Sequence, residues 1–129
     1  MIPIEQMRKP AERVRIAVIH ALDESVLPAR RAFAEAWPQA VCCDLLDASL
    51  SADLAFRGSL DQAISDRIRF LAEYMAATEG DGGKTAGILF TCSAFGLAIE
   101  TVKSFSQFQS SSQMKQRAKP LSITVAELA

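Results

Sequence analysis

Apolar positions along the chain follow two different periods, one typical of strands and one typical of helices. Short apolar runs occur three times: VRIAVIHAL begins at residue 14, AVCCDLLD at residue 40 and TAGILFT at residue 85. The first run is rich in β-branched residues and lies between a charged leader and an acidic loop. The pattern predicts three strands of the kind that is buried in parallel sheets.

Between and after these runs, apolar residues recur at helical spacing. The segment that follows the first run can be capped by Ser25 and is stopped by Pro38. Residues 60–78 place their apolar side chains on one stripe and most of their charges elsewhere. A further helix is expected over SAFGLAIETVKSF, residues 93–105. The sequence therefore predicts three amphipathic helices.

Polar breaks separate the remaining segments. SLSADLAFRGS, residues 49–59, predicts a loop over the sheet edge, and EGDGGK predicts a turn. Alternation of strand and helix implies right-handed crossovers and a parallel sheet covered by helices, which is an α/β fold. The length suits one domain, so we divide the chain into a leader over residues 1–13, an α/β domain over 14–105 and a tail over 106–129.

The charge balance narrows the classes of partner. Lys and Arg number 14, Asp and Glu number 15, and the net charge is -1, which predicts neither nucleic-acid binding nor attachment to an anionic membrane. The sequence has no apolar run of about 18 residues and no secretory signal pattern at its start. We therefore expect a cytoplasmic protein whose partner is a small molecule or another protein.

Three cysteines and one histidine give little basis for a disulfide framework or a metal site. Cys42 and Cys43 are adjacent, and no pair of cysteines has the CxxC spacing of a zinc site. Because both lie inside an apolar run, packing is the expected role of these two residues. The sequence thus predicts reduced thiols and no metal.

Cys92 stands where the third predicted strand passes into the third predicted helix. In parallel sheets, ligands bind beyond the carboxyl ends of the strands. Backbone N–H groups and the helix dipole favour a thiolate or a bound carboxylate there. Ser93 would add a hydroxyl, and Ala94 an unobstructed N–H. Burial of Cys92 in the core is the alternative, since cysteine is among the most buried residue types.

Three other chemistries can be tested on the same residues. A phosphatase-like thiolate loop needs an arginine six places after the cysteine, where this chain has Ala98. A serine-hydrolase elbow needs G-x-S-x-G, which the residues around Ser93 do not provide. A cysteine–histidine pair could use only His20, which ends the first predicted strand next to the third. An ordinary polar histidine at the sheet's edge is the alternative for His20.

The segments RIAVIHALDES and GILFTCSAFGLAIE resemble the aspartate/glutamate/hydantoin racemase superfamily, which includes arylmalonate decarboxylase and maleate isomerase. The resemblance covers residues 14–105 and implies the first of two similar α/β halves, a flavodoxin-like sheet in three layers. In that family two cysteines face each other across a cleft between the halves. One removes the proton α to a carboxylate and the other returns a proton to the opposite face. Cys92 matches the cysteine of the first half.

The resemblance also implies roles for the neighbours of Cys92. Ser93 and Ala94 would hold the substrate carboxylate, with Thr91 a weaker candidate, and the loop after the first strand would contribute His20 and Ser25. The substrate would be a small carboxylate or an amino-acid derivative, and no cofactor would be needed. The family pattern is Cys-Asn-Thr or Cys-Asn-Ser, whereas this chain has Cys92-Ser93-Ala94, which leaves the amino-acid specificity open. The choice between racemisation, decarboxylation and isomerisation also stays open, because the three reactions use the same carboxylate pocket and differ in groups on the second half.

The tail departs from the family. It has no cysteine and few early apolar residues, so we expect no fourth strand from it. Read from the third base of each codon, residues 106–116 can encode Pro-Ile-Pro-Val-Leu-Lys-Pro-Asn-Glu-Ala, which looks like the strand and loop that the family places after its third helix. We hypothesise a frameshift near residues 104–106 that replaced the second half.

A missing second half has consequences for function. The cleft would have one wall, so two-base racemisation by the chain alone is not expected. An exposed sheet edge and an uncovered face predict self-association. Two further interpretations remain open: a non-catalytic α/β module or degenerate fragment that binds a small molecule, and a redox-sensing thiol.

Overall fold

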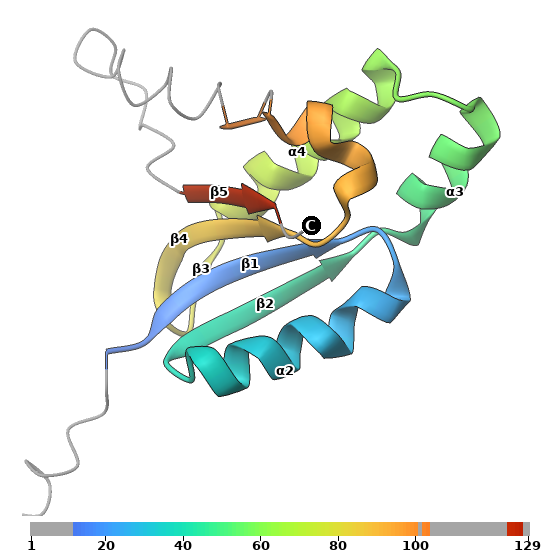
Figure 1. The fold of residues 1–129 in the computed structure, drawn as a ribbon. Coiled ribbons are helices and arrows are strands. Elements are labelled where there is room, and N and C mark those ends of the chain that lie inside the picture. Colours follow the sequence, from blue (N-terminus) through green and yellow to red (C-terminus); the bar gives the residue numbers. More distant parts are fainter. Residues whose placement is uncertain (1–11, 101, 104–123, 128–129) are drawn as a thin grey trace, which may run out of the picture.

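The structure, a computed structural model, describes residues 12–100, 102–103 and 124–127 (Figure 1). Its sheet has the order β2-β1-β4, and both β3 and β5 pair with β4. Pairing is parallel except for the short β3–β4 hairpin. The strands are β1 Val14–His20, β2 Ala40–Leu46, β3 Glu79–Gly80, β4 Gly83–Phe90 and β5 Thr124–Glu127. The prediction of an α/β fold on parallel strands is confirmed.

Helices cover both faces of this sheet, with α2 on one face and α3 and α4 on the other (Figure 1). The helices are α2 Val26–Ala36, α3 Ala48–Arg57 and α4 Gln62–Ala76, and the 3-10 turns are η1 Asp23–Ser25 and η2 Ser93–Phe95. Helical backbone follows η2 over residues 96–100 and 102–103. No helix in the described ranges has both the length and the apolar composition that a membrane crossing requires.

Alternation along β1 divides the core into two parts. Ala17 and Ile19 point towards α4, where they join the fully buried Ile64 and Ile68. Val18 points to the other face and joins a smaller cluster beneath α2. His20 follows Val18 at a spacing of two and therefore shares the face of α2. This alternation determines on which face of the sheet each side chain at the carboxyl ends of the strands lies.

The segment predicted as a loop over residues 49–59 forms most of α3, so that prediction was wrong. Asp47 caps the helix, because its carboxylate accepts from the backbone N–H of Ser49 at 3.0 Å. Gly58 ends it in the left-handed region at φ 78°, which glycine adopts without steric cost. Leu50 is buried in the larger core. Ser49 is exposed on this helix, whereas Ser51 is half-buried and its hydroxyl donates to the Ala21 carbonyl at 3.0 Å.

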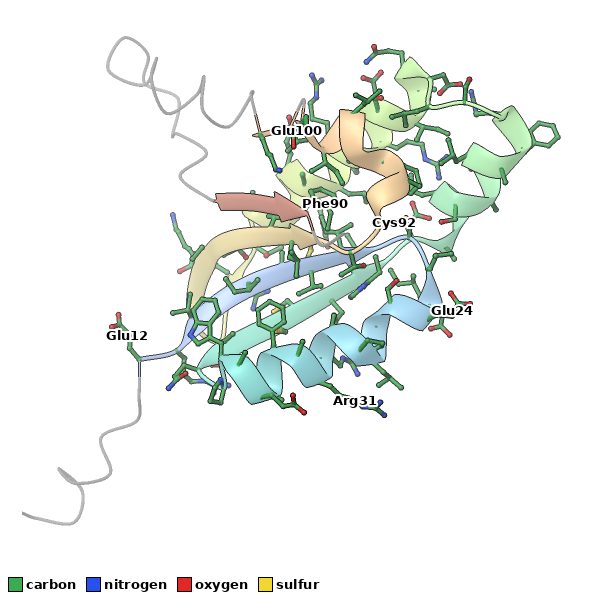
Figure 2. All side chains as sticks on the ribbon, in the orientation of Figure 1. Glu12, Glu24, Arg31, Phe90, Cys92 and Glu100 are labelled. Carbon is green, nitrogen blue, oxygen red and sulfur yellow. The ribbon has the colours of Figure 1, made fainter. Side chains whose placement is uncertain are left out.

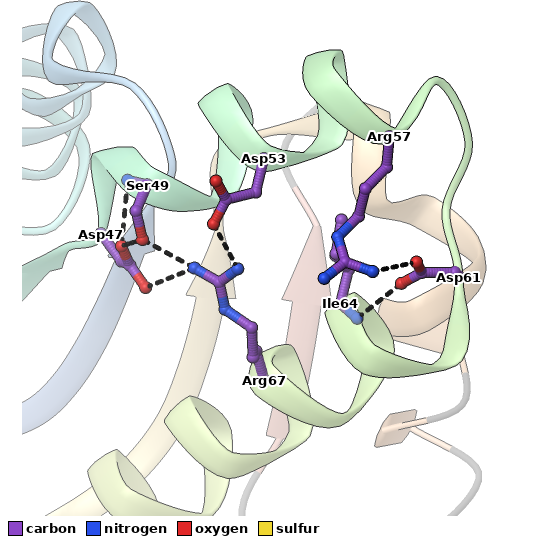
Figure 3. A network of polar contacts seen from close by, with 7 residues as sticks. All are labelled: Asp47, Ser49, Asp53, Arg57, Asp61, Ile64 and Arg67. Atoms are coloured by element: carbon purple, nitrogen blue, oxygen red, sulfur yellow. Dashed lines mark hydrogen bonds and ion pairs between the residues drawn. The ribbon is translucent and has the colours of Figure 1, made fainter.

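Arg67 joins α3 to α4 through a network of polar contacts (Figure 3). Its Nη1 donates to Asp53 Oδ2 at 2.6 Å, and its Nη2 donates to Ser49 Oγ at 2.6 Å and lies 3.6 Å from Asp47 Oδ2. The hydrogen bond to Asp53 raises the pKa of the Arg67 guanidinium. The network fixes α3 in place beside the carboxyl edge of the sheet.

The helix predicted over residues 60–78 is present as α4, and Asp61 caps its start (Figure 3). The Asp61 carboxylate accepts from the backbone N–H of Ile64 at 3.0 Å and from Arg57 Nη1 at 2.5 Å. These two interactions stabilise the charged form and lower the pKa of Asp61. The start of α4 therefore depends on an ionised carboxylate.

The tail supplies a strand, contrary to the sequence-based expectation. β5 pairs in parallel with β4, from Gly87 opposite Thr124 to Phe90 opposite Glu127. No strand was expected because the early part of the tail is rich in Ser and Gln. The strand forms later in the tail, where Thr124 and Val125 are residue types that favour strands. β5 covers the edge of β4 that was expected to be exposed. The other residues of the 106–129 tail lie outside the described ranges.

An apolar groove of about 360 Å³ runs between α2 and the β4 side of the sheet. Val14, Ile16, Phe33, Trp37 and Leu89 are among its lining residues. Trp37 is 39% exposed, so part of this apolar surface meets solvent. The self-association predicted from an exposed sheet edge and an uncovered face stays a prediction.

Candidate functional site

The carboxyl ends of β1 and β4 bring three of the predicted site residues together. Ile19 pairs with Phe90 in the parallel register, and the backbone N–H of Thr91 donates to the Ile19 carbonyl at 3.2 Å. His20 ends β1, and Thr91 follows directly after β4. Cys92 comes next, at the turn beyond Phe90 (Figure 2). The predicted adjacency of His20 and the third predicted strand is confirmed.

Cys92 is half-buried and packs against the larger core. It shares a cavity of about 10 Å³ with His20 and with the apolar side chains of Leu50, Ile68 and Phe95. A water molecule needs at least about 10–15 Å³, so this cavity does not admit a ligand. Any ligand of the Cys92 thiol would therefore approach it from the solvent-facing side.

The turn after Cys92 provides backbone donors. Ser93–Phe95 form η2, and the helical backbone continues over residues 96–100. Phe95 is buried and anchors the turn to the core, whereas Ala94 is exposed. The first N–H groups of a helical segment have no carbonyl partner within it and can bind an anion. The side chain of Ser93 lies outside the described side chains.

His20 is fully buried, and both of its ring nitrogens have partners. Nδ1 lies 2.8 Å from Thr91 Oγ1, and Nε2 lies 2.8 Å from Asp44 Oδ1. Asp44 Oδ2 accepts from Arg30 Nε at 2.7 Å. The alternative of a polar loop histidine at the sheet's edge was wrong, because His20 is the last residue of β1 and is fully buried. With both nitrogens engaged, His20 is also not hydrogen-bonded to the Cys92 thiol.

The contacts Thr91–His20–Asp44 have the connectivity of a hydrolytic triad. In a triad, however, the imidazole exchanges protons with the nucleophile and with the bound substrate. It therefore needs a space beside it that can hold the substrate. The His20 side chain is 0% exposed, so no open space for a substrate adjoins its ring. The arrangement fits a buried support for the turn of Cys92 better than acyl transfer.

Ser25 lies in the loop after β1, at the end of η1. It occupies the N-cap position of α2, but its side chain makes no capping hydrogen bond, because the residue continues a 3-10 turn with helical backbone angles. Among the described residues, no hydrogen bond links Ser25 to the Cys92 turn. Its predicted contact with a substrate stays a prediction.

Asp44 and Arg30 were missed by the sequence analysis. Asp44 is a charged residue within the apolar run of the second strand and shares a face with Cys42. A single carboxylate within such a run indicates a buried partner, and this signal could have found it. Arg30 gives no comparable signal, because α2 carries further basic and exposed positions.

The adjacent cysteines of β2 have a different environment. Cys42 and Cys43 are half-buried, since β2 forms an edge of the sheet. Burial is the main cause of a raised pKa of the Cys42 thiol, and the nearby Asp44 carboxylate adds to it. A raised pKa keeps this thiol protonated and unreactive near neutral pH.

No protein-family model, curated protein or solved structure matches this chain. Within the described ranges, no group of three or more His, Cys, Asp or Glu side chains is arranged to hold a metal ion. Assignment of function therefore rests on the residues at the carboxyl ends of β1 and β4. These are the half-buried Cys92 thiol, the backbone donors of η2, and the hydrogen bonds that join Thr91, His20 and Asp44.

Proposed function

We propose that this protein carries out cofactor-independent proton transfer α to a carboxylate, in the manner of the aspartate/glutamate/hydantoin racemase superfamily, with the Cys92 thiolate as base. Residues 14–105 would form the first half of such an enzyme, a flavodoxin-like sheet in three layers. The observation that carries the proposal is the position of Cys92, half-buried at the carboxyl end of β4 and directly before a helical turn.

The chemistry requires a base and a group that accommodates the charge that develops. The thiolate takes the α-proton, the C–H bond breaks, and its electron pair moves onto the carboxylate to give an enediolate. Backbone N–H groups of Ser93 and Ala94 stabilise the added negative charge. When the Cys92 thiol returns a proton to the same face, the configuration is retained. In D₂O the returned atom is deuterium.

Inversion would require a second base on the opposite face of the α-carbon. We propose that a second half, encoded in the shifted frame after residue 105, supplies this base. The reading of residues 106–116 as a proline-containing strand and loop supports this proposal. Sequencing the transcript through the codons for residues 105–129 tests it. A shifted frame that is closed or encodes an unrelated peptide contradicts it.

The function is tested by wash-in of deuterium from D₂O. We expect ¹H NMR to show loss of the α-proton signal of a small carboxylate, from a panel of both enantiomers of aspartate, glutamate and N-carbamoyl amino acids. Chiral chromatography should show unchanged configuration. Cys92→Ser should abolish the wash-in, whereas Cys42→Ser, a matched change at another half-buried thiol, should leave it intact. No wash-in with any member of the panel would contradict the proposal.

A non-catalytic binding module is the second candidate, favoured by the packing of Cys92 against the core. It predicts that wild type and Cys92→Ala bind a carboxylate from the panel equally well, without deuterium wash-in. Isothermal titration of both proteins separates the two candidates. A loss of binding in Cys92→Ala that accompanies the loss of wash-in supports the enzyme.

A further inference from the structure

The segments that follow β1, β2 and β4 meet at the edge of the sheet that carries Cys92 (Figure 2). Ala21, the first residue after β1, lines the same small cavity as Cys92. The Ala21 carbonyl accepts from Ser51 Oγ at 3.0 Å, and the backbone N–H of Asp47 donates to the His20 carbonyl at 3.0 Å. These two bonds hold the start of α3 against this edge. A ligand of the Cys92 thiol therefore approaches η1 and the start of α3.

The guanidinium groups nearest to this edge are already bound to carboxylates. Arg30 Nε donates to Asp44 Oδ2 at 2.7 Å. Arg67 Nη1 donates to Asp53 Oδ2 at 2.6 Å, and Arg67 Nη2 lies 3.6 Å from Asp47 Oδ2 (Figure 3). A carboxylate that a ligand brought to either guanidinium would have to displace one of these partners.

Acidic side chains outnumber basic ones at the same edge. The ion pair of Arg30 is neutral, whereas Arg67 is shared by two carboxylates and leaves one negative charge. Arg31 lies on the side of α2 that points away from the sheet (Figure 2). Asp23 and Glu24 on η1 are exposed, and no ion pair of either is found among the described residues. The described side chains of this edge therefore carry three uncompensated negative charges.

Apolar side chains are also exposed there. Leu22, which follows Ala21, is 43% exposed, and Leu46, which ends β2, is 40% exposed. These side chains offer contact to an apolar group of a ligand, and burial of that contact is favourable. They offer neither a hydrogen bond nor a charge.

A second carboxylate on a ligand would find no partner at this edge. In the proposed function, the backbone N–H groups of η2 hold the carboxylate next to the reacting carbon. No described residue of the edge offers an unpaired cation to a further carboxylate. A charge that leaves water without a partner is costly, and like charges nearby add to the cost. An uncharged side group of the same shape meets neither cost.

We propose that the Cys92 site takes monocarboxylates with an uncharged, apolar side group and rejects dicarboxylates. The inference rests on the proposed function in taking Cys92 as the base, and it adds the class of substrate. Aspartate and glutamate are then poor substrates, and derivatives of amino acids such as leucine are good ones.

The test compares deuterium wash-in for the N-carbamoyl derivatives of leucine, asparagine and aspartate. The three side groups have similar shapes, and only that of aspartate is charged. The N-carbamoyl group removes the charge of the α-amine from the comparison. We expect wash-in to be fastest for the leucine derivative and at least about tenfold slower for aspartate than for asparagine, which corresponds to about 1.4 kcal/mol. At about 1 M NaCl the Debye length is about 3 Å, so the difference between aspartate and asparagine should shrink, whereas a steric cause would leave it unchanged.

Two variants change the charge of this edge. Leu22→Arg supplies a cation and should raise the aspartate-to-asparagine ratio of rates about tenfold, back towards equal rates. Leu22→Gln is the matched control, since it is polar and uncharged and should leave this ratio unchanged. Asp23→Asn combined with Glu24→Gln removes two exposed negative charges and should raise the ratio as well. Circular dichroism confirms that each variant is folded.

Several results would overturn the inference and keep the proposed function. These are equal wash-in of the aspartate and asparagine derivatives by the wild type, slower exchange of the leucine derivative than of the asparagine derivative, and a ratio that neither charge variant changes. Wash-in that is confined to free aspartate or glutamate has the same meaning. Absence of wash-in with these derivatives and with the rest of the panel rejects the proposed function and the inference together.

Discussion

Truncation of Asp44 should destabilise the fold by more than its place on the edge strand β2 suggests. The Asp44 carboxylate can only accept, so His20 Nε2 donates in their 2.8 Å contact, and Asp44→Ala leaves this donor without an acceptor in a site that is 0% exposed. A buried donor without a partner costs about 1–3 kcal/mol. The second bond of Asp44 goes to a guanidinium that is 57% exposed, and an exposed ion pair contributes about 0–1 kcal/mol. We therefore expect the free energy of unfolding to fall by about 2 kcal/mol in total.

The matched control is Arg30→Ala, which removes the exposed ion pair and leaves the His20–Asp44 bond in place. Its expected loss is at most about 1 kcal/mol. Urea unfolding followed by circular dichroism measures both variants, with a shift in midpoint and an unchanged slope. The double change of His20→Leu and Asp44→Leu should cost less than the sum of the single changes, because no buried polar group is then left unpaired. Equal losses for Asp44→Ala and Arg30→Ala would refute this reasoning.

Three further predictions concern residues other than Cys92, namely Asp61, Cys42 and Gly58. The pKa of Asp61 is lowered in the fold, so its ionised carboxylate stabilises α4 above about pH 4, and this stabilisation is lost as the pH falls through the folded pKa. The free energy of unfolding of wild type and of Asp61→Asn, measured in urea, should therefore differ near neutral pH and become equal in acid; a difference that stays constant would contradict this. The raised pKa of Cys42 predicts slower alkylation than a free cysteine at mildly alkaline pH, and Asp44→Asn should speed it, as mass spectrometry of the labelled peptide can show. Gly58→Ala should cost about 1 kcal/mol by urea unfolding, because φ is 78° and only strain opposes the added methyl; an unchanged midpoint would contradict that cause.

The strands that carry the site were predictable because their apolar runs are short and their boundaries are chemically distinct. β1, β2 and β4 begin and end close to the predicted positions. α3 was missed although Asp47 and Gly58 are ordinary start and stop signals, since small residues between them hid a short apolar stripe of Leu50 and Leu54. β5 was missed because its four residues gain their strand conformation from pairing with β4, and a pairing partner is not visible in local sequence.

The sequence predicts those features of the site that follow from the order of the strands along the chain. Parallel strands place their carboxyl ends together, so His20, Thr91 and Cys92 could be expected at one edge. Which polar groups satisfy a buried imidazole depends on side-chain direction in three dimensions, and this kept Asp44 and Arg30 out of the prediction. Alternation along β1 indicates that His20 points towards α2, but only the three-dimensional structure shows that the Asp44 carboxylate lies within hydrogen-bond distance of its ring.

The measurement that bears most directly on the central claim is the rate of deuterium wash-in at the α-carbon of the best substrate in the panel, compared between wild type, Cys92→Ser and Cys42→Ser at one protein concentration. The account predicts wash-in by the wild type and by Cys42→Ser, with retained configuration, and none by Cys92→Ser. Wash-in of equal rate in all three proteins, with Cys92→Ser folded as judged by circular dichroism, would contradict the assignment of Cys92 as the base.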